Sequence, residues 1–540
     1  MGTQQITPVI SYLRKAAQRW PERPALVAPQ CVNYRQLYGR VQRWASVYQR
    51  HGVEAGERVA IWLPKCPEYL TALYAAMESG GVYVPLDGMQ PAERACRILE
   101  SAQPSILVTD IRRLTELDDR LPSSLTLIVV VDGEAEAEVP VPVQTLSSAD
   151  LDSEHATALP HRPAPDDLAA ILFTSGSTGT PKGVQVSYRN LDSFINWALD
   201  EFSLSEQDVF ASHAGFHFDL STFDYFAAAA VGAGVWMVRE PEQRNVGVLL
   251  EGIRHHGVTV WYSVPSVLAL LAATEQLTLS ITRTLRYVLF AGEPFPIGAL
   301  RQLRASLPGK CELYNLYGPT ETNVCLYHRV CEEDLNRIRP VSIGRPLPGV
   351  SATIENEKGE PVTQEGRIGE LIISGPCVTP GYWRREDPDN AGNHRRNRHA
   401  TGDLVSVENG LIEYHGRRDR MVKIQGNRVE MGEIEAVLSA MAGVGDVAVV
   451  VDRYDGAPQL VVFHTVEEGQ SVGALAVRQY CARHLPRYMI PRRILQLETM
   501  PRNANGKVDY RRLEQQLAEQ HSRHQPSSAV QPLEQDSAHV

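Results

Sequence analysis

The feature that most constrains the fold of this 540-residue chain is a regular alternation of short apolar runs with amphipathic segments. Residues 58–63 and 82–86 have the length and composition of buried strands, and residues 68–79 between them have helical spacing. Further strands are predicted at 105–109, 168–173, 235–238, 258–262, 287–291 and 312–316. Such alternation predicts an α/β fold with doubly wound, largely parallel sheets, which bind ligands beyond the carboxyl ends of their strands.

The pattern changes twice along the chain. After residue 341 short strands dominate and predict a β-rich subdomain, in which residues 384–399 form a mobile, arginine-rich surface loop. From about residue 420 a further 100 residues with α+β pattern suffice for a small second domain. We therefore predict a large domain over 1–418, a small C-terminal domain over 419–515 and a disordered polar tail over 516–540.

Composition excludes several classes of protein. The net charge is −11 and no basic stripe is present, so nucleic acid is not the expected partner. The eight cysteines form no C-x-x-C pair, which indicates reduced thiols and no metal site built from them. No signal-like N-terminus and no apolar run of membrane-spanning length is found, so we expect a cytoplasmic protein without a membrane partner.

Residues 172–184 read LFTSGSTGTPKGV, with hydroxyl groups set among glycines and a lysine at position 182. Glycines let backbone N–H groups turn toward an anion, and the hydroxyls and Lys182 add donors and charge. The loop is not of the Walker type, because Gly183 follows the lysine where a Ser or Thr would be needed. A flexible Gly/Ser linker is the alternative interpretation.

This loop resembles the signature loop of the adenylate-forming superfamily, which includes acyl-CoA synthetases, luciferases and the adenylation domains of nonribosomal peptide synthetases. The resemblance implies that six of its residues hold ATP phosphates: Thr174, Ser175, Gly176, Ser177, Thr178 and Lys182. It also implies a hinge at Asp419, about which the small domain rotates between two half-reactions.

Residues 315–322, NLYGPTET, match a second motif of this family. The resemblance implies that Asn315 reaches the adenine amino group, Tyr317 stacks on the purine, Thr320 binds the α-phosphate and Glu321 is a ligand of Mg²⁺. Gly318 makes the turn, and the resemblance further implies that Gly292 and Glu293, which follow the strand predicted at 287–291, form the turn on the adenine side. Read without the family, residues 315–322 are an ordinary turn at a strand end.

Three further positions match the family's ribose and junction motifs: Asp403, Arg417 and Lys423. Lys507, in the sequence NANGKVD, matches the lysine that meets the reacting carboxylate and is an expected catalytic residue together with Thr320 and Glu321. The alternatives are a surface cluster of basic residues and a solvated lysine in an Asn-Gly turn.

Asp219 lies in the sequence FDLS, where amino-acid-activating members keep a carboxylate for the substrate's α-amino group. Fatty-acid and aryl activators have no amine to bind, and a helix N-cap is the alternative role for this aspartate. The other pocket positions implied by the resemblance are Leu220, Phe223, Ser263, Leu289, Ala291, Leu316, Val324 and Cys325, with Lys507 at the far end. The register at Ser263 could slip by one, since Tyr262 is adjacent.

A compact apolar pocket with an ammonium partner suits a small apolar amino acid. The stretches HFDLS, WYSVPS, LFAGEPFP and NLYGPTETNVC closely resemble those of stand-alone L-proline-activating enzymes. We therefore expect ATP- and Mg²⁺-dependent formation of prolyl-AMP, followed by transfer to the phosphopantetheine thiol of a separate peptidyl carrier protein. Valine or another small apolar amino acid stays open, because apolar pockets discriminate weakly between isosteres. Two other classes also stay open: an acyl-CoA synthetase, and a non-catalytic nucleotide-binding relative.

Overall fold

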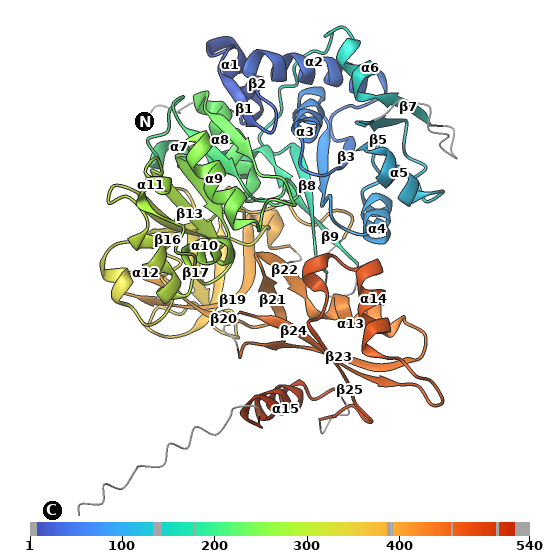
Figure 1. Ribbon diagram of the computed structural model, residues 1–540, viewed down its shortest axis with the longest axis vertical. Helices are drawn as coiled ribbons and strands as arrows, with labels where there is room; N and C mark the ends of the chain where they lie inside the picture. Colours follow the sequence, from blue (N-terminus) through green and yellow to red (C-terminus); the bar gives the residue numbers. More distant parts are fainter. Residues whose placement is uncertain are drawn as a thin grey trace, which may run out of the picture. The chain divides into compact units, whose positions relative to one another are not determined.

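The computed structural model describes residues 8–132, 143–176, 180–385, 390, 392–454, 457–503 and 507–523. The chain forms two compact units (Figure 1). The first comprises Met1–Glu433 with Ala482–Tyr488, and the second comprises Ile434–Cys481 with Met489–Val540. The predicted domain boundary at 418/419 was placed at the expected hinge residue Asp419, and it stays a prediction.

The first unit contains a seven-stranded sheet whose strands run, in spatial order, β7 (Gln144–Ser147), β6 (Leu127–Val130), β5 (Ile106–Thr109), β3 (Arg58–Trp62), β4 (Val82–Leu86), β8 (Leu168–Thr174) and β9 (Lys182–Ser187). All neighbours are parallel except β9, which pairs antiparallel with β8. The predicted parallel arrangement is confirmed, but β9 was not predicted. Because Thr174 pairs with Lys182, the glycine-rich loop is the connection of a β-hairpin.

A second, nine-stranded sheet has the order β16 (Arg345–Pro346), β15 (Leu326–Arg329), β14 (Glu312–Tyr317), β13 (Tyr287–Ala291), β12 (Val260–Ser263), β10 (Val209–Ser212), β11 (Gly234–Met237), β1 (Pro24–Ala28) and β2 (Val32–Asn33). The six strands from β14 to β1 are parallel, and antiparallel strands flank them at both edges. The carboxyl ends of β12, β13 and β14 therefore meet at one edge, which is where a ligand site is expected.

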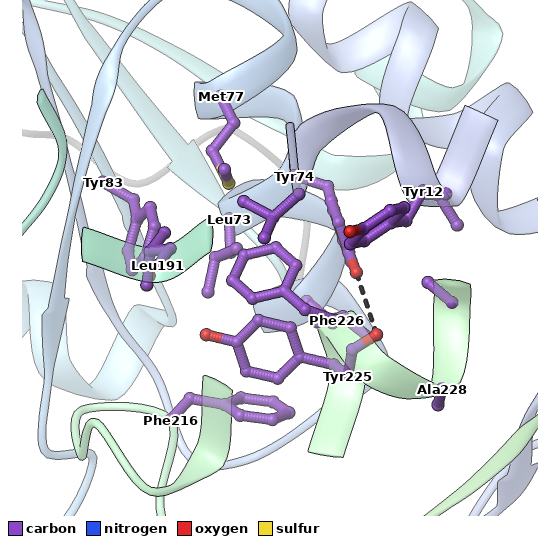
Figure 2. Close-up of a cluster of buried hydrophobic side chains, with 14 of the residues drawn as sticks. Tyr12, Leu73, Tyr74, Met77, Tyr83, Leu191, Phe216, Tyr225, Phe226 and Ala228 are labelled. Carbon is purple, nitrogen blue, oxygen red and sulfur yellow. Dashed lines mark hydrogen bonds between the residues drawn. The ribbon is translucent and has the colours of Figure 1, made fainter. Parts of the chain in front are cut away.

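The helices of the first unit are α1 (Ile10–Arg19), α2 (Tyr34–Arg50), α3 (Pro67–Ser79), α4 (Ala92–Ala102), α5 (Ile111–Leu117), α6 (Ser148–Ser153), α7 (Tyr188–Glu201), α8 (Ser221–Val231), α9 (Val246–His256), α10 (Pro265–Ala272), α11 (Leu279–Thr282) and α12 (Ile297–Ala305). Helix α8 is apolar on nearly all sides and is buried. Figure 2 shows its Tyr225 and Phe226 among side chains of α1 and α3. The Tyr74 hydroxyl donates to the Tyr225 carbonyl at 3.2 Å, so the middle of α8 is tied to α3.

The β-rich part of this unit is a four-stranded antiparallel sheet of β17 (Ser351–Glu355), β18 (Gly369–Ser374), β19 (Arg398–Glu408) and β20 (Leu411–Arg417), followed by a hairpin of β21 (Met421–Ile424) and β22 (Asn427–Glu430). The prediction of a surface loop over 384–399 was wrong at its described end. His394 and His399 are buried and hydrogen-bond each other at 3.0 Å, and β19 already begins at Arg398. The polar composition of this segment predicted an exposed loop. Histidine can nevertheless be buried when its ring nitrogens have hydrogen-bond partners.

The second unit has a three-stranded sheet of β23 (Val444–Asp452), β24 (Gln459–Val466) and β25 (Arg493–Gln496), accompanied by α15 (Tyr510–Arg523) and by most of α13 (Met431–Ser439) and α14 (Ala474–His484), whose first and last three residues respectively belong to the first unit. Leu513 and Leu517 of α15 are buried in its core. The predicted disordered tail was therefore wrong for residues 516–523, and residues 524–540 lie outside the described part. Among the helices of the described residues, none is both long and apolar enough to cross a bilayer.

Candidate active site

A cavity of ≈ 80 Å³ lies at the carboxyl ends of β8, β12, β13 and β14 in the first unit. The loops after these strands and the β19–β22 segment supply its walls. The sequence-predicted residues that line it are Thr174, Ser175, Asp219, Leu220, Ala291, Gly292, Gly318, Thr320, Val324, Asp403, Arg417 and Lys423. Residues more than 240 positions apart in the chain therefore meet in one small space.

Asp219 lies in the loop between β10 and α8 and lines the cavity. The N-cap position of α8 is Leu220 and no side chain caps the helix, so the carboxylate is not engaged in capping. Burial raises the pKa of Asp219, while Lys423 and the Thr320 hydroxyl oppose that rise. The result is a largely desolvated carboxyl group beside one lysine, which is suited to a cationic guest.

The apolar side of the cavity differs by one residue from the predicted register. Tyr262, and not Ser263, lines the cavity, and among the described residues its buried hydroxyl has no hydrogen-bond partner. Ser263 Oγ instead accepts a hydrogen bond from Trp261 Nε1 at 2.8 Å. The remaining predicted pocket residues lie in the core around the cavity and not on its wall: Phe223, Leu289, Leu316 and Cys325.

Asp403 is the centre of a buried polar cluster at one end of the cavity. Its carboxylate accepts a short hydrogen bond from the Tyr317 hydroxyl. It also forms an ion pair with Arg417, whose Nη1 lies 2.8 Å from Asp403 Oδ1. Arg417 also forms a bidentate pair with Asp419, at 2.7 and 2.6 Å. Burial together with Asp403 raises the pKa of Tyr317 well above its ordinary value, and burial lowers the pKa of Lys423 against the attraction of Asp403 and Asp219.

Glu321 sits behind the cavity with its side chain fully buried and surrounded by cations. Arg428 Nη1 lies 2.9 and 3.0 Å from its two oxygens, Lys182 Nζ lies at 3.6 Å, and the Tyr382 hydroxyl donates to it at 2.6 Å. Burial alone would raise the pKa of Glu321, but Arg428 and Lys182 hold it well below its ordinary value. Burial also lowers the pKa of the adjacent His399 to about 3.

The glycine-rich loop is described up to residue 176 and again from residue 180; the predicted phosphate-binding residues Ser177 and Thr178 lie outside the described residues. Thr174 Oγ1 is buried and makes no hydrogen bond within the described part of the chain. Such an orphaned hydroxyl at a cavity wall fits an oxygen-rich guest. A Cβ at Gly176 would lie 2.1 Å from the Thr180 carbonyl, so only glycine fits there.

Asn315 and Glu293 are held by the protein itself. Asn315 Nδ2 donates to the Ser342 carbonyl at 2.8 Å, and Glu293 accepts from Gly426 N at 2.8 Å and Ser266 N at 3.2 Å. Gly292 has φ +95°, which favours glycine. Lys507 belongs to the second unit, where Asn503 Oδ1 accepts its backbone N–H at 3.1 Å.

Several residues at the site were not predicted. His217 and Phe218, which precede Asp219 in the chain, line the cavity, and so do Asn427, Arg428 and Tyr488. Arg428 belongs to the junction motif. Its pairing with Glu321 could not be predicted from local sequence, because 107 residues separate the two. Only the folded chain reveals this pair.

The chain belongs to the family of AMP-binding enzymes: residues 13–383 match the AMP-binding enzyme family, and residues 433–507 match the AMP-binding enzyme C-terminal domain. It is 48% identical over 509 residues to the L-proline--[L-prolyl-carrier protein] ligase of Streptomyces coelicolor, covering 94% of this chain and 96% of that protein. It is 38% identical to the ligase of the same name from Pseudomonas fluorescens, covering 91% and 95%.

A solved structure supports the assignment of the fold. The Vibrio cholerae adenylation domain AlmE, in complex with glycyl-adenosine-5'-phosphate, superposes with a TM-score of 0.81 at 28% identity. The match covers 96% of this chain and 99% of that one. The predicted membership of the adenylate-forming superfamily is thus confirmed, and with it the assignment to the ligases.

Proposed function

We propose that this protein is an ATP-dependent ligase that activates L-proline to prolyl-AMP and passes the prolyl group to the phosphopantetheine thiol of a separate peptidyl carrier protein. The identity of 48% to an L-proline--[L-prolyl-carrier protein] ligase over nearly the whole of both chains carries this proposal. The cavity supports it independently, because it places the partly buried carboxylate of Asp219 beside apolar and aromatic walls.

The first half-reaction joins two anions. A proline carboxylate oxygen attacks the α-phosphorus of ATP, the bond from that phosphorus to the bridging oxygen breaks, and pyrophosphate leaves with the electron pair. Asp219 binds the ammonium end of proline and so orients the carboxylate toward the nucleotide. Asp403 and Arg417 hold the ribose side, and Lys182 lowers the repulsion between the two reactants. Lys507 bridges the substrate carboxylate and the phosphate in this scheme.

The second half-reaction needs no covalent bond to the protein. The thiol sulfur attacks the prolyl carbonyl carbon, the bond from that carbon to the AMP oxygen breaks, and the thiol proton passes to solvent. In this scheme a pivot at Asp419 removes Lys507 from the site before the thiol enters. In the same scheme the small mobile domain comprises residues 419–515. The substrate is proline, and the macromolecular partner is the carrier protein.

Magnesium is the expected companion of ATP, with Glu321 as its protein ligand. In the described arrangement Glu321 does not fit that task, because both of its oxygens accept hydrogen bonds from Arg428.

Amino-acid-dependent ATP–pyrophosphate exchange tests the proposal across a panel of proline, valine, alanine, glycine and several fatty and aryl acids. We expect exchange to be highest with proline. Exchange only with fatty or aryl acids would identify an acyl-CoA synthetase, and no exchange with any acid would identify a nucleotide-binding relative. A second reaction with a phosphopantetheinylated carrier protein or with coenzyme A then identifies the thiol acceptor.

Lys507→Ala tests the role of the lysine in the first half-reaction. We expect it to lower exchange by about 10²-fold or more, because the approach of the two reacting groups loses its cationic bridge. ATP binding, measured by equilibrium dialysis, should be unchanged. Near-normal exchange by this variant would show that the lysine has another role.

A further inference from the structure

His217 lines the cavity, but the first half-reaction gives it no task. It precedes Asp219 by two positions, and its side chain is partly exposed. Within the described part of the chain, neither of its ring nitrogens makes a hydrogen bond. Its Nε2 lies 4.0 Å from Asp87 Oδ2, which is too far for a hydrogen bond but close enough for attraction once the ring carries a proton.

The position of this imidazole is set by the segment that carries it. A Cβ at Gly215 would lie 2.6 Å from His217 Cε1 and 2.8 Å from Nδ1, so the ring packs directly against the glycine. The Phe218 ring lies 4.4 Å from the imidazole, centroid to centroid. Phe216 is buried against Tyr225 in the core (Figure 2), which anchors the segment. The ring is therefore held in place without the use of either nitrogen.

The carboxylate beside the imidazole is held by its own loop. Asp87 directly follows β4, and its Oδ1 accepts a hydrogen bond from Met89 N at 2.8 Å. Its carbonyl accepts one from Trp62 Nε1 at 3.2 Å. A Cβ at Gly88 would lie 2.2 Å from the Leu63 carbonyl oxygen, so the loop packs closely on the chain after β3. One carboxylate oxygen thus fixes the loop, and the other is left for the imidazole.

The other ionisable side chains on the cavity wall are less suited to take up a proton. Asp403 already accepts a hydrogen bond and an ion pair, and Asp219 is assigned to the ammonium group of the substrate. Lys423 is the cation beside both carboxylates. Burial raises the pKa of Tyr262 and of Tyr488, so both hydroxyls keep their protons. Among the described residues of this wall, the imidazole is therefore the best general base.

The second half-reaction takes place within reach of this ring. The prolyl carbonyl carbon is two bonds from the nitrogen that Asp219 binds, so it stays inside the cavity of ≈ 80 Å³ that His217 also lines. A thiol that attacks this carbon must enter the same small space. Because the thiolate is the nucleophile and a thiol is only partly ionised near neutral pH, removal of the thiol proton limits the attack.

We propose that His217 is the general base of the second half-reaction and that Asp87 is its positioning residue. The S–H bond breaks as the proton passes to the imidazole nitrogen that faces away from Asp87, and the sulfur attacks the carbonyl carbon with the electron pair. The bond from that carbon to the AMP oxygen then breaks, AMP leaves with its electron pair, and the imidazolium returns the proton to solvent. The inference rests on the proposed function, which supplies the adenylate and the thiol.

Single-turnover thioester formation tests this role separately from the first half-reaction. The full-length protein forms the adenylate from ATP and the acid that gives the highest exchange, and pantetheine is then added as the probe thiol. We expect His217→Gln to slow thioester formation about 10²- to 10⁴-fold, the usual contribution of a general base, and to slow ATP–pyrophosphate exchange roughly 10-fold less than that. Equal losses in both half-reactions, or undiminished thioester formation, would overturn the proposal.

His255→Gln is the matched control, because this exposed histidine of α9 lies outside the cavity. It should change neither half-reaction. Gly215→Ala keeps the imidazole but forces the ring away from its place, and we expect it to slow thioester formation about 10-fold or more. If His217→Gln does not fold, Asp87→Asn decides, since its side chain retains an acceptor for Met89 N and loses only the charge beside the ring.

A series of thiols distinguishes a base from a structural support. Trifluoroethanethiol is more acidic than pantetheine and is ionised to a greater extent without help, so it depends less on a base. The losses caused by His217→Gln and by Asp87→Asn should therefore shrink as the thiol becomes more acidic. Losses that are the same for every thiol would contradict the proposal.

Failure of this inference is distinguishable from failure of the proposed function. Absence of exchange with every acid in the unaltered protein would contradict the proposed function, and the inference with it. Normal exchange in the unaltered protein, together with full thioester formation by His217→Gln, would contradict the general base alone.

Discussion

Tyr262 and Ser263 are neighbours on β12, and the alternation of the strand sends their side chains to opposite faces of the sheet. The tyrosine reaches the cavity, and the serine binds the indole of Trp261 on the other face. Two adjacent positions on the strand therefore have different roles: the side chain of one lines the cavity, and that of the next makes a hydrogen bond in the core. At the scale of single residues, specificity depends on this register.

A pair of variants separates these two positions. Tyr262→Leu removes an aromatic wall and a hydroxyl next to Asp219, and we expect KM for proline to rise about 10-fold or more. Ser263→Ala should leave KM unchanged and lower the free energy of unfolding by about 1–3 kcal/mol, because the indole N–H of Trp261 loses its acceptor. Steady-state exchange kinetics and urea unfolding give both values. A larger change in KM for Ser263→Ala would restore the originally predicted register.

Asp219→Asn keeps the shape of the side chain and removes its charge. We expect kcat/KM for proline to fall by about 10²-fold or more, since truncating one partner of a desolvated charge pair costs about 2–5 kcal/mol. KM for ATP should stay within twofold, roughly the change that loss of a distant charge allows. A uniform loss toward proline and ATP would instead indicate that Asp219 supports the nucleotide site.

At the scale of elements, the position of Asp219 depends on how its loop is held between β10 and α8. Lys65 is buried between β3 and α3, and its Nζ donates to the carbonyls of Ser212 and Ala214 at 2.6 Å each. Burial lowers the pKa of Lys65 to about 8, against the attraction of Asp224 and Glu240. A single ammonium group therefore fastens the start of the loop, while the packing of α8 in the core fastens its end.

Lys65→Met tests this anchoring role. The methionine fills similar space but leaves two carbonyls without their donor, so we expect kcat/KM for proline to fall about 10- to 100-fold through misplacement of Asp219. KM for ATP should change little, which separates positioning of the amino acid from general unfolding. Lys310→Met, at an exposed position, is the control and should have no effect. Equal losses toward proline and ATP would contradict a specific role for the loop.

At the scale of the whole molecule, the first unit is held together by contacts between distant segments, and one of them is pH-sensitive. Asp192 on α7 accepts a hydrogen bond from Val9 N at 2.9 Å across 183 residues. Burial raises the pKa of Asp192 to about 7, although the bond from Val9 opposes the rise. The folded protein therefore retains a proton here at pH values where the unfolded chain has lost it.

Asp192→Asn should reveal this pH dependence. Between about pH 4 and 7 the folded state binds more protons than the unfolded state, so the contribution of Asp192 to stability falls as the pH rises and reaches its minimum above 7. We expect the free energy of unfolding of the variant, relative to the unaltered protein, to increase across that window by up to about 4 kcal/mol. Urea unfolding at pH 5, 6 and 8 measures the difference. A difference independent of pH would show that Asp192 ionises normally.

Much of the architecture was predictable from local pattern. The predicted strand at 287–291 coincides with β13 and that at 82–86 with β4, because a short apolar run buried on both faces leaves little choice of structure. The antiparallel strands β9 and β15 were not predicted, since their pairing is set by partners that the local pattern does not reveal. The buried pair of His394 and His399 was missed for a related reason, because polar residues indicate exposure until a partner is known.

By itself the sequence determined the class of fold and the order of its motifs, and it pointed to Asp219, which lines the cavity, because each depends on residues near one another in the chain. Only the tertiary structure decided that Tyr262 faces the cavity and that Arg428 holds Glu321. Those outcomes depend on strand register and on charges brought together across 107 residues, and electrostatic attraction acts over distance in space and not along the chain.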